Sequence, residues 1–159
     1  MNLLFAGTLD NFKLDSKGRL SVPTKWRERL GREFYVVAVT VKGCHCLTLY
    51  PTEEFEKVYE STQIGSENNR YNTSKELLSK TEEASLDSQG RFTLNQRLKE
   101  MAMLSNDSDV IYEGNGRSIE IWSPAQYEKM HNTFDPNIGI YDLIDRANHA
   151  DGAPVSDQG

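Results

Sequence analysis

The sequence predicts an α+β, mostly β fold that is built from two pseudo-symmetric repeats, each with the element order β-β-α-β-β-α. Three observations support this prediction. The frame D-S-x-G-R occurs at 15–19 and again at 87–91. The offset between these two copies also aligns 47–58 with 119–130 without a gap. Short runs of alternating apolar and polar residues, separated by turn residues, are typical of half-buried strands.

The first half is expected to begin with a strand pair and a short helix. Apolar and polar residues alternate over 12–14 and again over 19–22, and the letters D-S-K-G between these runs favour a turn. Trp26 and Leu30 lie four residues apart, so both would face the same side of a helix over 24–30. A glycine follows directly and favours the end of this helix.

A second strand pair and a second helix complete the first half. The runs F-Y-V-V-A-V-T-V (34–41) and C-L-T-L-Y (46–50) are separated by a Lys-Gly turn. A helix is expected to begin at Thr52, with Glu53 and Glu54 in its first turn. Negative charges there are favourable because the N-terminus of a helix carries partial positive charge.

The second half is expected to repeat this order. The first of its helices should cover 96–103, and the last should be capped by Ser123-Pro124. Its strands and turns are expected as a strand to Leu86, a turn at 87–90, a strand to Leu94, and strands at 109–113 and 118–122 around Gly-Asn-Gly.

The domain organisation follows from this duplication. At 159 residues the chain has the size of one ordinary domain, and a duplication favours two half-domains that share one core. The polar stretch 62–72 is expected to loop out before a linking helix near 74–83. We expect a first half-domain at 7–61, a linker with a connecting helix at 62–83, a second half-domain at 84–134, and an acidic, partly disordered tail at 135–159.

A metal site and a membrane segment are both disfavoured. Cys44 and Cys46 flank His45, but zinc needs about four ligands, and His131 and His149 lie far away in the sequence. We therefore expect no metal and no cofactor. The longest apolar run is only as long as a strand, and the N-terminus lacks a basic leader segment, so the sequence indicates a cytoplasmic protein without membrane contact.

Each residue of the repeated frame has a local role in a tight turn. The aspartate can accept hydrogen bonds from backbone N–H groups two or three residues later, and the glycine can take the positive φ that closes the turn. The arginine starts the outgoing strand. It can pair with its own aspartate, or present its planar fork to guanine or phosphate, and both can hold at once. These residues are Asp15, Gly18 and Arg19 in the first copy and Asp87, Gly90 and Arg91 in the second.

The two copies L-D-S-K-G-R-L-S-V-P-T-K-W-R-E-R-L and L-D-S-Q-G-R-F-T-L-N-Q-R-L-K-E-M, with the closing strands L-T-L-Y-P and I-E-I-W-S, resemble the MraZ family of bacterial transcriptional regulators. The resemblance covers roughly 7–130. It implies an AbrB-like swapped-hairpin barrel with two pseudo-symmetric halves. It also implies a ring-shaped homo-oligomer that binds short, G-rich direct repeats in the promoter of its own cell-division and cell-wall gene cluster, usually as a repressor.

The resemblance also points to the residues that would contact double-stranded DNA. The arginine that contacts DNA in the family falls on Arg19, and its second-repeat partner falls on Arg91. One departure is Asn95, where the family usually has proline, so the second strand-to-helix corner is expected to be less rigid. The remaining candidates for DNA contact are Lys13, Lys17, Gly18, Lys25 and Arg27 in the first copy, and Gln89 and Gly90 in the second.

The distribution of charge supports a DNA footprint despite a net charge of −6. Segment 13–32 holds seven cations and two carboxylates, a local charge of +5, which leaves −11 for the rest of the chain. Segment 87–100 holds three cations and two carboxylates, a local charge of +1. Because DNA affinity depends mainly on cations meeting phosphates, the first copy is expected to dominate binding.

Two other classes of function remain open from the sequence. Two D-S turns invite comparison with the paired aspartates of an acid hydrolase, but an arginine four residues after each aspartate would lower its pKa and keep it ionised, which is wrong for a general acid. The chain could also be an oligomeric scaffold that binds a protein partner and no DNA, because AbrB-like barrels also serve as dimerising domains.

Overall fold

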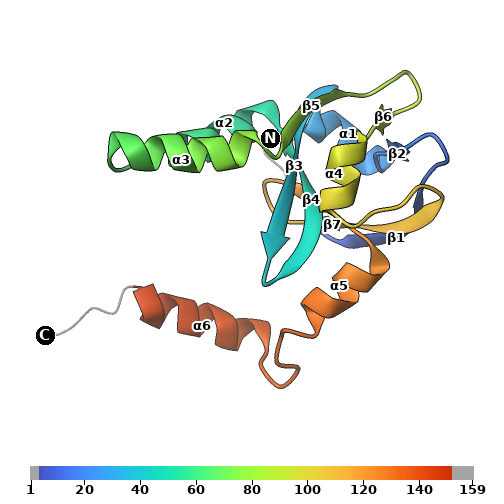
Figure 1. Cartoon of the computed structure of the whole chain (residues 1–159). Coiled ribbons are helices and arrows are strands. Elements are labelled where there is room, and N and C mark those ends of the chain that lie inside the picture. The colour runs from blue at the N-terminus through green and yellow to red at the C-terminus, as the bar shows by residue number, and fades with distance from the viewer. Residues whose placement is uncertain (1–3, 152–159) are drawn as a thin grey trace, which may run out of the picture.

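The computed structural model describes residues 4–151 and consists of a β-sheet body with helices around it (Figure 1). Six strands form one antiparallel sheet in the order β1-β7-β8-β4-β3-β5, and β2 pairs with β6 in a separate two-stranded sheet. The strands are β1 (Thr8–Leu14), β2 (Arg19–Ser21), β3 (Glu33–Val41), β4 (Cys44–Pro51), β5 (Thr81–Ser85), β6 (Arg91–Thr93), β7 (Ser108–Gly114) and β8 (Ile119–Trp122). The helices are α1 (Thr24–Leu30), α2 (Thr52–Ser61), α3 (Glu67–Leu78), α4 (Gln96–Met101), α5 (Pro124–His131) and α6 (Ile140–Asp151).

The predicted double order β-β-α-β-β-α is confirmed, and the two halves exchange strands. β1 of the first half pairs with β7 of the second, β3 of the first pairs with β5 of the second, and β2 pairs with β6. Each half therefore completes the sheet of the other. This mixed α+β arrangement fits the expected swapped-hairpin fold, and the two halves share one hydrophobic core.

The core lies where the two halves meet. Phe34 of the first half packs edge-to-face on Phe92 of the second, with ring centroids 5.2 Å apart. Leu20 and Phe92 are opposite each other on β2 and β6 and are both buried. Each such apolar side chain contributes about 1.5–3 kcal/mol when it is fully buried, so the exchange of strands is held mainly by apolar contacts between the halves.

One buried hydrogen bond joins the halves within this core. Tyr112 is fully buried, and its hydroxyl donates to the carbonyl oxygen of Ser21 over 2.7 Å. Burial raises the pKa of the Tyr112 hydroxyl, so the group stays protonated and can donate. The bond links β7 of the second half to β2 of the first.

Removing this hydroxyl is expected to destabilise the protein. Tyr112→Phe leaves the Ser21 carbonyl without this donor at a partly buried site, which should lower the free energy of unfolding by about 1–2 kcal/mol in urea denaturation. Tyr71→Phe is the matched control because the Tyr71 side chain is 62% exposed, and its change should stay within about 0.5 kcal/mol. Equal losses in the two variants would contradict the role of the buried bond.

The linker differs from the prediction. The connecting helix α3 covers Glu67–Leu78 and not 74–83, and the stretch expected to loop out contributes its first turns. The side chain of Ser66 caps this helix by accepting a hydrogen bond from the Asn69 N–H over 3.1 Å. Residues 81–83 belong to β5, because pairing with β3 draws them into the sheet.

Two further boundaries need correction. α4 ends at Met101 and not at 103, since Met103 takes a positive φ of 59° that ends the helical path. The tail, which was expected to be acidic and loose at its end, contains a further helix, α6, that the sequence analysis did not predict. The end of the tail, 152–159, lies outside the described residues.

Candidate nucleic-acid interface

The first D-S-x-G-R frame forms a closed turn between β1 and β2. Oδ1 of Asp15 accepts hydrogen bonds from the backbone N–H of Lys17 over 2.9 Å and of Arg19 over 2.8 Å. Nε of Arg19 donates to Oδ2 of the same Asp15 over 2.8 Å. Gly18 has a φ of 76°, which a residue with a side chain rarely adopts. One aspartate thus closes the turn and also fixes the base of the Arg19 side chain.

The second frame repeats this geometry. Oδ1 of Asp87 accepts from the N–H of Gln89 over 2.8 Å and of Arg91 over 2.9 Å. Nε of Arg91 donates to Oδ2 of Asp87 over 3.2 Å, and Gly90 has a φ of 77°. The two turns are therefore pseudo-symmetric in hydrogen bonding as well as in sequence.

Both turn aspartates are held in the ionised form. The hydrogen bond from the backbone N–H of Arg19 is the main cause that lowers the pKa of Asp15. The hydrogen bond from the backbone N–H of Arg91 lowers the pKa of Asp87 in the same way. Hydrogen bonds from the two arginine side chains act in the same direction. A carboxyl that is held ionised in this way is unsuited to act as a general acid.

The short strands β2 and β6 place both arginines on one face. Arg19 is opposite Thr93, and Arg91 is opposite Ser21. Residues directly opposite in an antiparallel pair, and residues two apart on one strand, point to the same side. The intervening Leu20–Phe92 pair points into the core, so Arg19 and Arg91 are diagonal neighbours on the outer face, at about 7–8 Å. Their side chains are 29% and 27% exposed.

The two turns interlock through backbone hydrogen bonds. The carbonyl of Gly18 accepts from the Leu94 N–H over 2.8 Å, and the Val22 N–H donates to the carbonyl of Gly90 over 3.0 Å. Each turn is therefore anchored to the strand that leaves the other turn. This makes the pair of turns one rigid unit, which we call the β2–β6 ribbon and define as 15–22 with 87–94.

Comparison with known proteins places this architecture in one family. The family model described as "MraZ protein, putative antitoxin-like" matches the chain twice, over 4–76 and over 77–137. This chain belongs to the MraZ family. The transcriptional regulator MraZ of Roseiflexus castenholzii is 32% identical over 141 residues, covering 87% of this chain and 94% of the relative. The transcriptional regulators MraZ of Alkaliphilus oremlandii and Finegoldia magna are 34% and 33% identical, covering 84% and 87% of this chain and 90% and 93% of the relatives.

Membership of the MraZ family argues against the hydrolase alternative. The relatives are named transcriptional regulators, which is not a class of enzymes. The lowered pKa values of the two turn aspartates agree with this. Asn95, which aligns with Pro23 of the first copy, caps α4 by accepting a hydrogen bond from the Leu98 N–H over 2.8 Å. The lower rigidity expected of this corner stays a prediction.

The cations of the first copy differ in how far they are exposed and paired in this MraZ-family structure. Lys17 and Lys25 are exposed, and Lys25 also lies 5.3 Å from the centroid of the Trp26 ring. Lys13 is exposed and pairs with Asp109 over 3.3 Å, which offsets its charge. Arg27 and Arg29 are only partly exposed and pack against the protein itself. The local charge of +5 in the sequence therefore overstates the positive charge at the surface.

Arg27 braces the turn of the opposite half. Its Nε donates to the carbonyl of Val22 over 2.7 Å, and its guanidinium lies against Gly90, where a Cβ atom would come within 2.2 Å of Cζ. Only a residue without a side chain leaves room for this contact. The φ of 77° favours glycine at position 90, and a side chain there would in addition move the guanidinium of Arg27 from its place over the turn.

Lys99 of α4 supports the ribbon, although the sequence did not single it out. It is the second-repeat equivalent of Arg27 and takes the corresponding place over the other turn, 3.2 Å from where a Cβ of Gly18 would be. Its Nζ donates to Oδ1 of Asn106 over 2.9 Å, and Nδ2 of Asn106 donates to the carbonyl of Ser16 over 3.3 Å. The repeat offset was the signal that could have found it.

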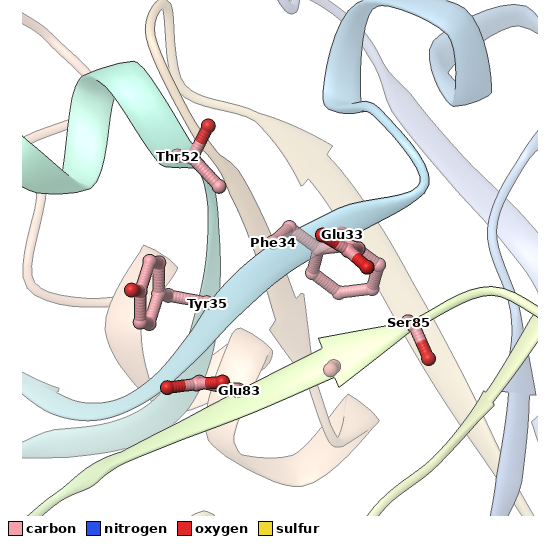
Figure 2. A pocket seen from close by; sticks show the side chains of 7 residues that line it. Glu33, Phe34, Tyr35, Thr52, Glu83 and Ser85 are labelled. Atoms are coloured by element: carbon pink, nitrogen blue, oxygen red, sulfur yellow. The ribbon is translucent and has the colours of Figure 1, made fainter.

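One hollow of the described surface lies away from the ribbon arginines. It is formed on the outer side of β3 and β5 and beside the start of α2 (Figure 2). Glu33, Tyr35 and Glu83 lie along it, with Tyr35 next to Glu83, its partner across the strands. Two carboxylates in this hollow would repel phosphate groups, so it does not extend the candidate DNA surface.

The cysteine pair lies in a small second core. Cys44 and Cys46 are free and buried, together with Trp122 and Met130. Burial raises the pKa of the Cys46 thiol, which keeps it protonated at neutral pH and a poor metal ligand. Within 4–151, no group of three or more His, Cys, Asp or Glu side chains is placed to hold a metal ion.

Among the described helices, none has the length and apolar character needed to cross a bilayer.

Proposed function

We propose that this MraZ-family protein is a transcriptional regulator that binds double-stranded DNA by placing the β2–β6 ribbon in the major groove. The observation that carries the proposal is the position of Arg19 and Arg91 on one outer face of a rigid two-stranded ribbon. The major groove of B-DNA admits a two-stranded ribbon of this kind. The relatives named transcriptional regulator MraZ support the same class of function.

The arginines are proposed to read bases and the lysines to contact phosphates. A bidentate contact from an arginine to O6 and N7 is the most common specific contact to guanine, which fits G-rich target repeats. The ion pair with Asp15 engages Nε of Arg19, so the terminal amino groups of the fork lie outside this bond. Lys17 and Lys25, both exposed, are placed to meet phosphates. Lys13 and Gln89, which are exposed, complete the proposed contact region. Gly18 and Gly90 are buried in the turns, and Arg27 lies over Gly90, so these three residues are proposed to shape the contact region from beneath.

The regulatory role is proposed on the strength of family membership. The protein would bind G-rich direct repeats in the promoter of its own cell-division and cell-wall gene cluster and repress it. It would act in the cytoplasm, associated with the nucleoid. Expression of a reporter gene behind that promoter should rise when the gene for this protein is deleted. A fall in reporter expression would indicate that the protein is an activator.

The sequence read by the protein can be found by selecting bound duplexes from random DNA with the purified full-length chain. Enrichment of repeated G-containing sites supports base reading by the ribbon. Affinity should fall steeply with salt, with a logarithmic slope of about −0.9 for each phosphate contact. A protein scaffold without DNA contact would enrich no sequence and would show no salt-dependent binding.

We also propose that the protein acts as a ring-shaped homo-oligomer larger than a dimer. Several identical ribbons in one ring raise the apparent affinity for matched repeats, because binding of the first ribbon raises the effective concentration of the others. Light scattering at micromolar concentration should give a mass several times the 18.1 kDa of the chain. A mass near 18.1 kDa would contradict both the ring and the multivalent binding that rests on it.

A further inference from the structure

The loop between α4 and β7 fastens the first turn, although this loop belongs to the second half. The N–H of Asp107 donates to the carbonyl oxygen of Leu14, just before the turn, over 2.7 Å. Nδ2 of Asn106 donates to the carbonyl oxygen of Ser16, inside the turn, over 3.3 Å. These bonds lie on either side of Asp15, the residue whose carboxylate closes the turn.

The side chain of Lys99 fixes how the amide of Asn106 is turned. Nζ of Lys99 donates to Oδ1 of Asn106 over 2.9 Å. An ammonium group can only donate hydrogen bonds, so the amide turns its oxygen toward Lys99, which leaves Nδ2 to face the Ser16 carbonyl. Lys99 is only 8% exposed, and a buried ammonium group is costly without such a partner. The two side chains therefore hold each other in place beside Gly18.

Burial makes Lys99 a support of the ribbon and not a group that meets phosphate. A phosphate contact requires an accessible ammonium group, such as that of the exposed Lys17. The hydrogen bonds of Lys99 lead instead through Asn106 to the turn from which Arg19 extends. Lys99 can thus affect DNA binding only through the position of this turn.

Base reading depends more on that position than phosphate contact does. A bidentate contact to guanine needs the planar fork of Arg19 held within about 0.5 Å and 10–20° of its correct place. A lysine meets phosphate as a point charge and tolerates more movement. We propose that Lys99 is a positioning residue for base reading, which holds, through Asn106, the turn that carries Arg19. This inference rests on the proposed function of the β2–β6 ribbon, and it means that the second half sets how the first half reads DNA.

The experiment removes the ammonium group of Lys99 in the full-length chain and keeps the length of the side chain. Lys99→Met should weaken binding to the selected operator by about tenfold, within the loss expected for a misplaced bidentate contact. Fluorescence anisotropy should show little change for a scrambled duplex. The salt slope should stay that of the wild type, whereas loss of a direct phosphate contact would flatten it by about one unit.

Two further substitutions separate positioning from the general loss of a cation. Lys75→Met is the matched control, because Lys75 is exposed on α3, which lies away from β2 and β6 (Figure 1). It should bind both duplexes like the wild type. Lys99→Arg keeps a donor at this place and should restore most of the operator affinity that Lys99→Met loses.

Double variants identify the residue through which Lys99 acts. Adding Lys99→Met to Arg19→Ala should cause no further fall in operator affinity, because the contact that Lys99 positions is already lost. Adding Lys99→Met to Arg91→Ala should still cause the fall of about tenfold, since the hydrogen bonds of Lys99 lead to the first turn.

Asn106→Ala repeats the test without removing a buried charge. Asn106 is exposed, so this variant should fold like the wild type, lose operator affinity as Lys99→Met does, and show the same dependence on Arg19. It decides the matter if Lys99→Met melts below the temperature of the assay. Unchanged operator affinity, an equal fall for both duplexes, or an equal fall with and without Arg19 would overturn the positioning role and leave operator binding by the wild type intact. A wild type that prefers no sequence would instead contradict the proposed function.

Discussion

Replacement of Arg19 by alanine is expected to weaken binding to the selected operator by about 1–3 kcal/mol for each ribbon that engages the DNA. In a ring that engages several repeats, these free-energy losses add, so the factors by which affinity falls multiply. The cause is the loss of a guanidinium that Asp15 holds at the base of a rigid ribbon. Fluorescence anisotropy with labelled operator and with a scrambled duplex measures the effect. The operator should lose much more affinity than the scrambled duplex.

Three further substitutions make this experiment specific. Arg91→Ala should have a smaller effect than Arg19→Ala, because the second copy has Gln89 where the first has Lys17. Lys17→Ala should weaken binding to all sequences alike and flatten the salt slope by about one unit. Arg19→Lys keeps the charge but loses the planar fork, so it should retain non-specific binding and lose preference for the operator.

A purely structural role for Arg19 makes a different prediction. If the side chain only braced Asp15, Arg19→Ala would lower the melting temperature or break the assembly before it altered sequence preference. Melting temperature and mass are therefore measured on the same samples as operator affinity. A folded and assembled Arg19→Ala protein that binds the operator like the wild type would contradict base reading by this residue.

Replacement of Gly90 by alanine is expected to lower the free energy of unfolding by about 2–4 kcal/mol. Two costs combine in this variant. A side chain at a φ of 77° is strained, and the new Cβ would lie 2.2 Å from Cζ of Arg27, so the guanidinium must leave its place over the turn. Urea denaturation measures the loss.

The control for Gly90 is Gly43. It has the same φ of 77°, but a Cβ there would meet nothing within 4 Å. Gly43→Ala should therefore show the strain alone, about 1–2 kcal/mol. The double variant with Arg27→Ala and Gly90→Ala should lose less than the sum of the two single losses, because the first change removes the atoms that the new Cβ would meet. Equal losses for Gly43→Ala and Gly90→Ala would show that the contact with Arg27 is not needed.

The linking region shows why some boundaries could not be predicted. Segment 62–72 is polar and lacks apolar periodicity, which is typical of a loop, yet α3 begins at Glu67 behind the cap at Ser66. Residues 81–83 contain two glutamates and favour a helix locally, yet they form β5 because β3 offers its free edge. Local preference was weaker here than pairing with a strand that is distant in the sequence.

The cations of the candidate site also show what the sequence could not predict, namely the direction of each side chain. The sequence places seven cations in 13–32 but does not show which way they point. In the structure, Arg27 lies over Gly90 and Arg29 lies 5.0 Å from the ring of Phe5, so both pack on the protein. The sequence counts Lys99 only as one of the cations of 87–100, yet in the structure it braces the first turn through Asn106.

The sequence by itself determined the two turns and the order of the elements. The hydrogen bonds that the Asp15 side chain makes all lie within 15–19, so a local pattern suffices to specify them, and the repetition of that pattern at 87–91 specifies the second turn. Only the tertiary structure decided that β2 pairs with β6 and that Arg19 and Arg91 share one face. That pairing depends on burial of Leu20 against Phe92, and a contact between residues so far apart is decided by how the whole core packs.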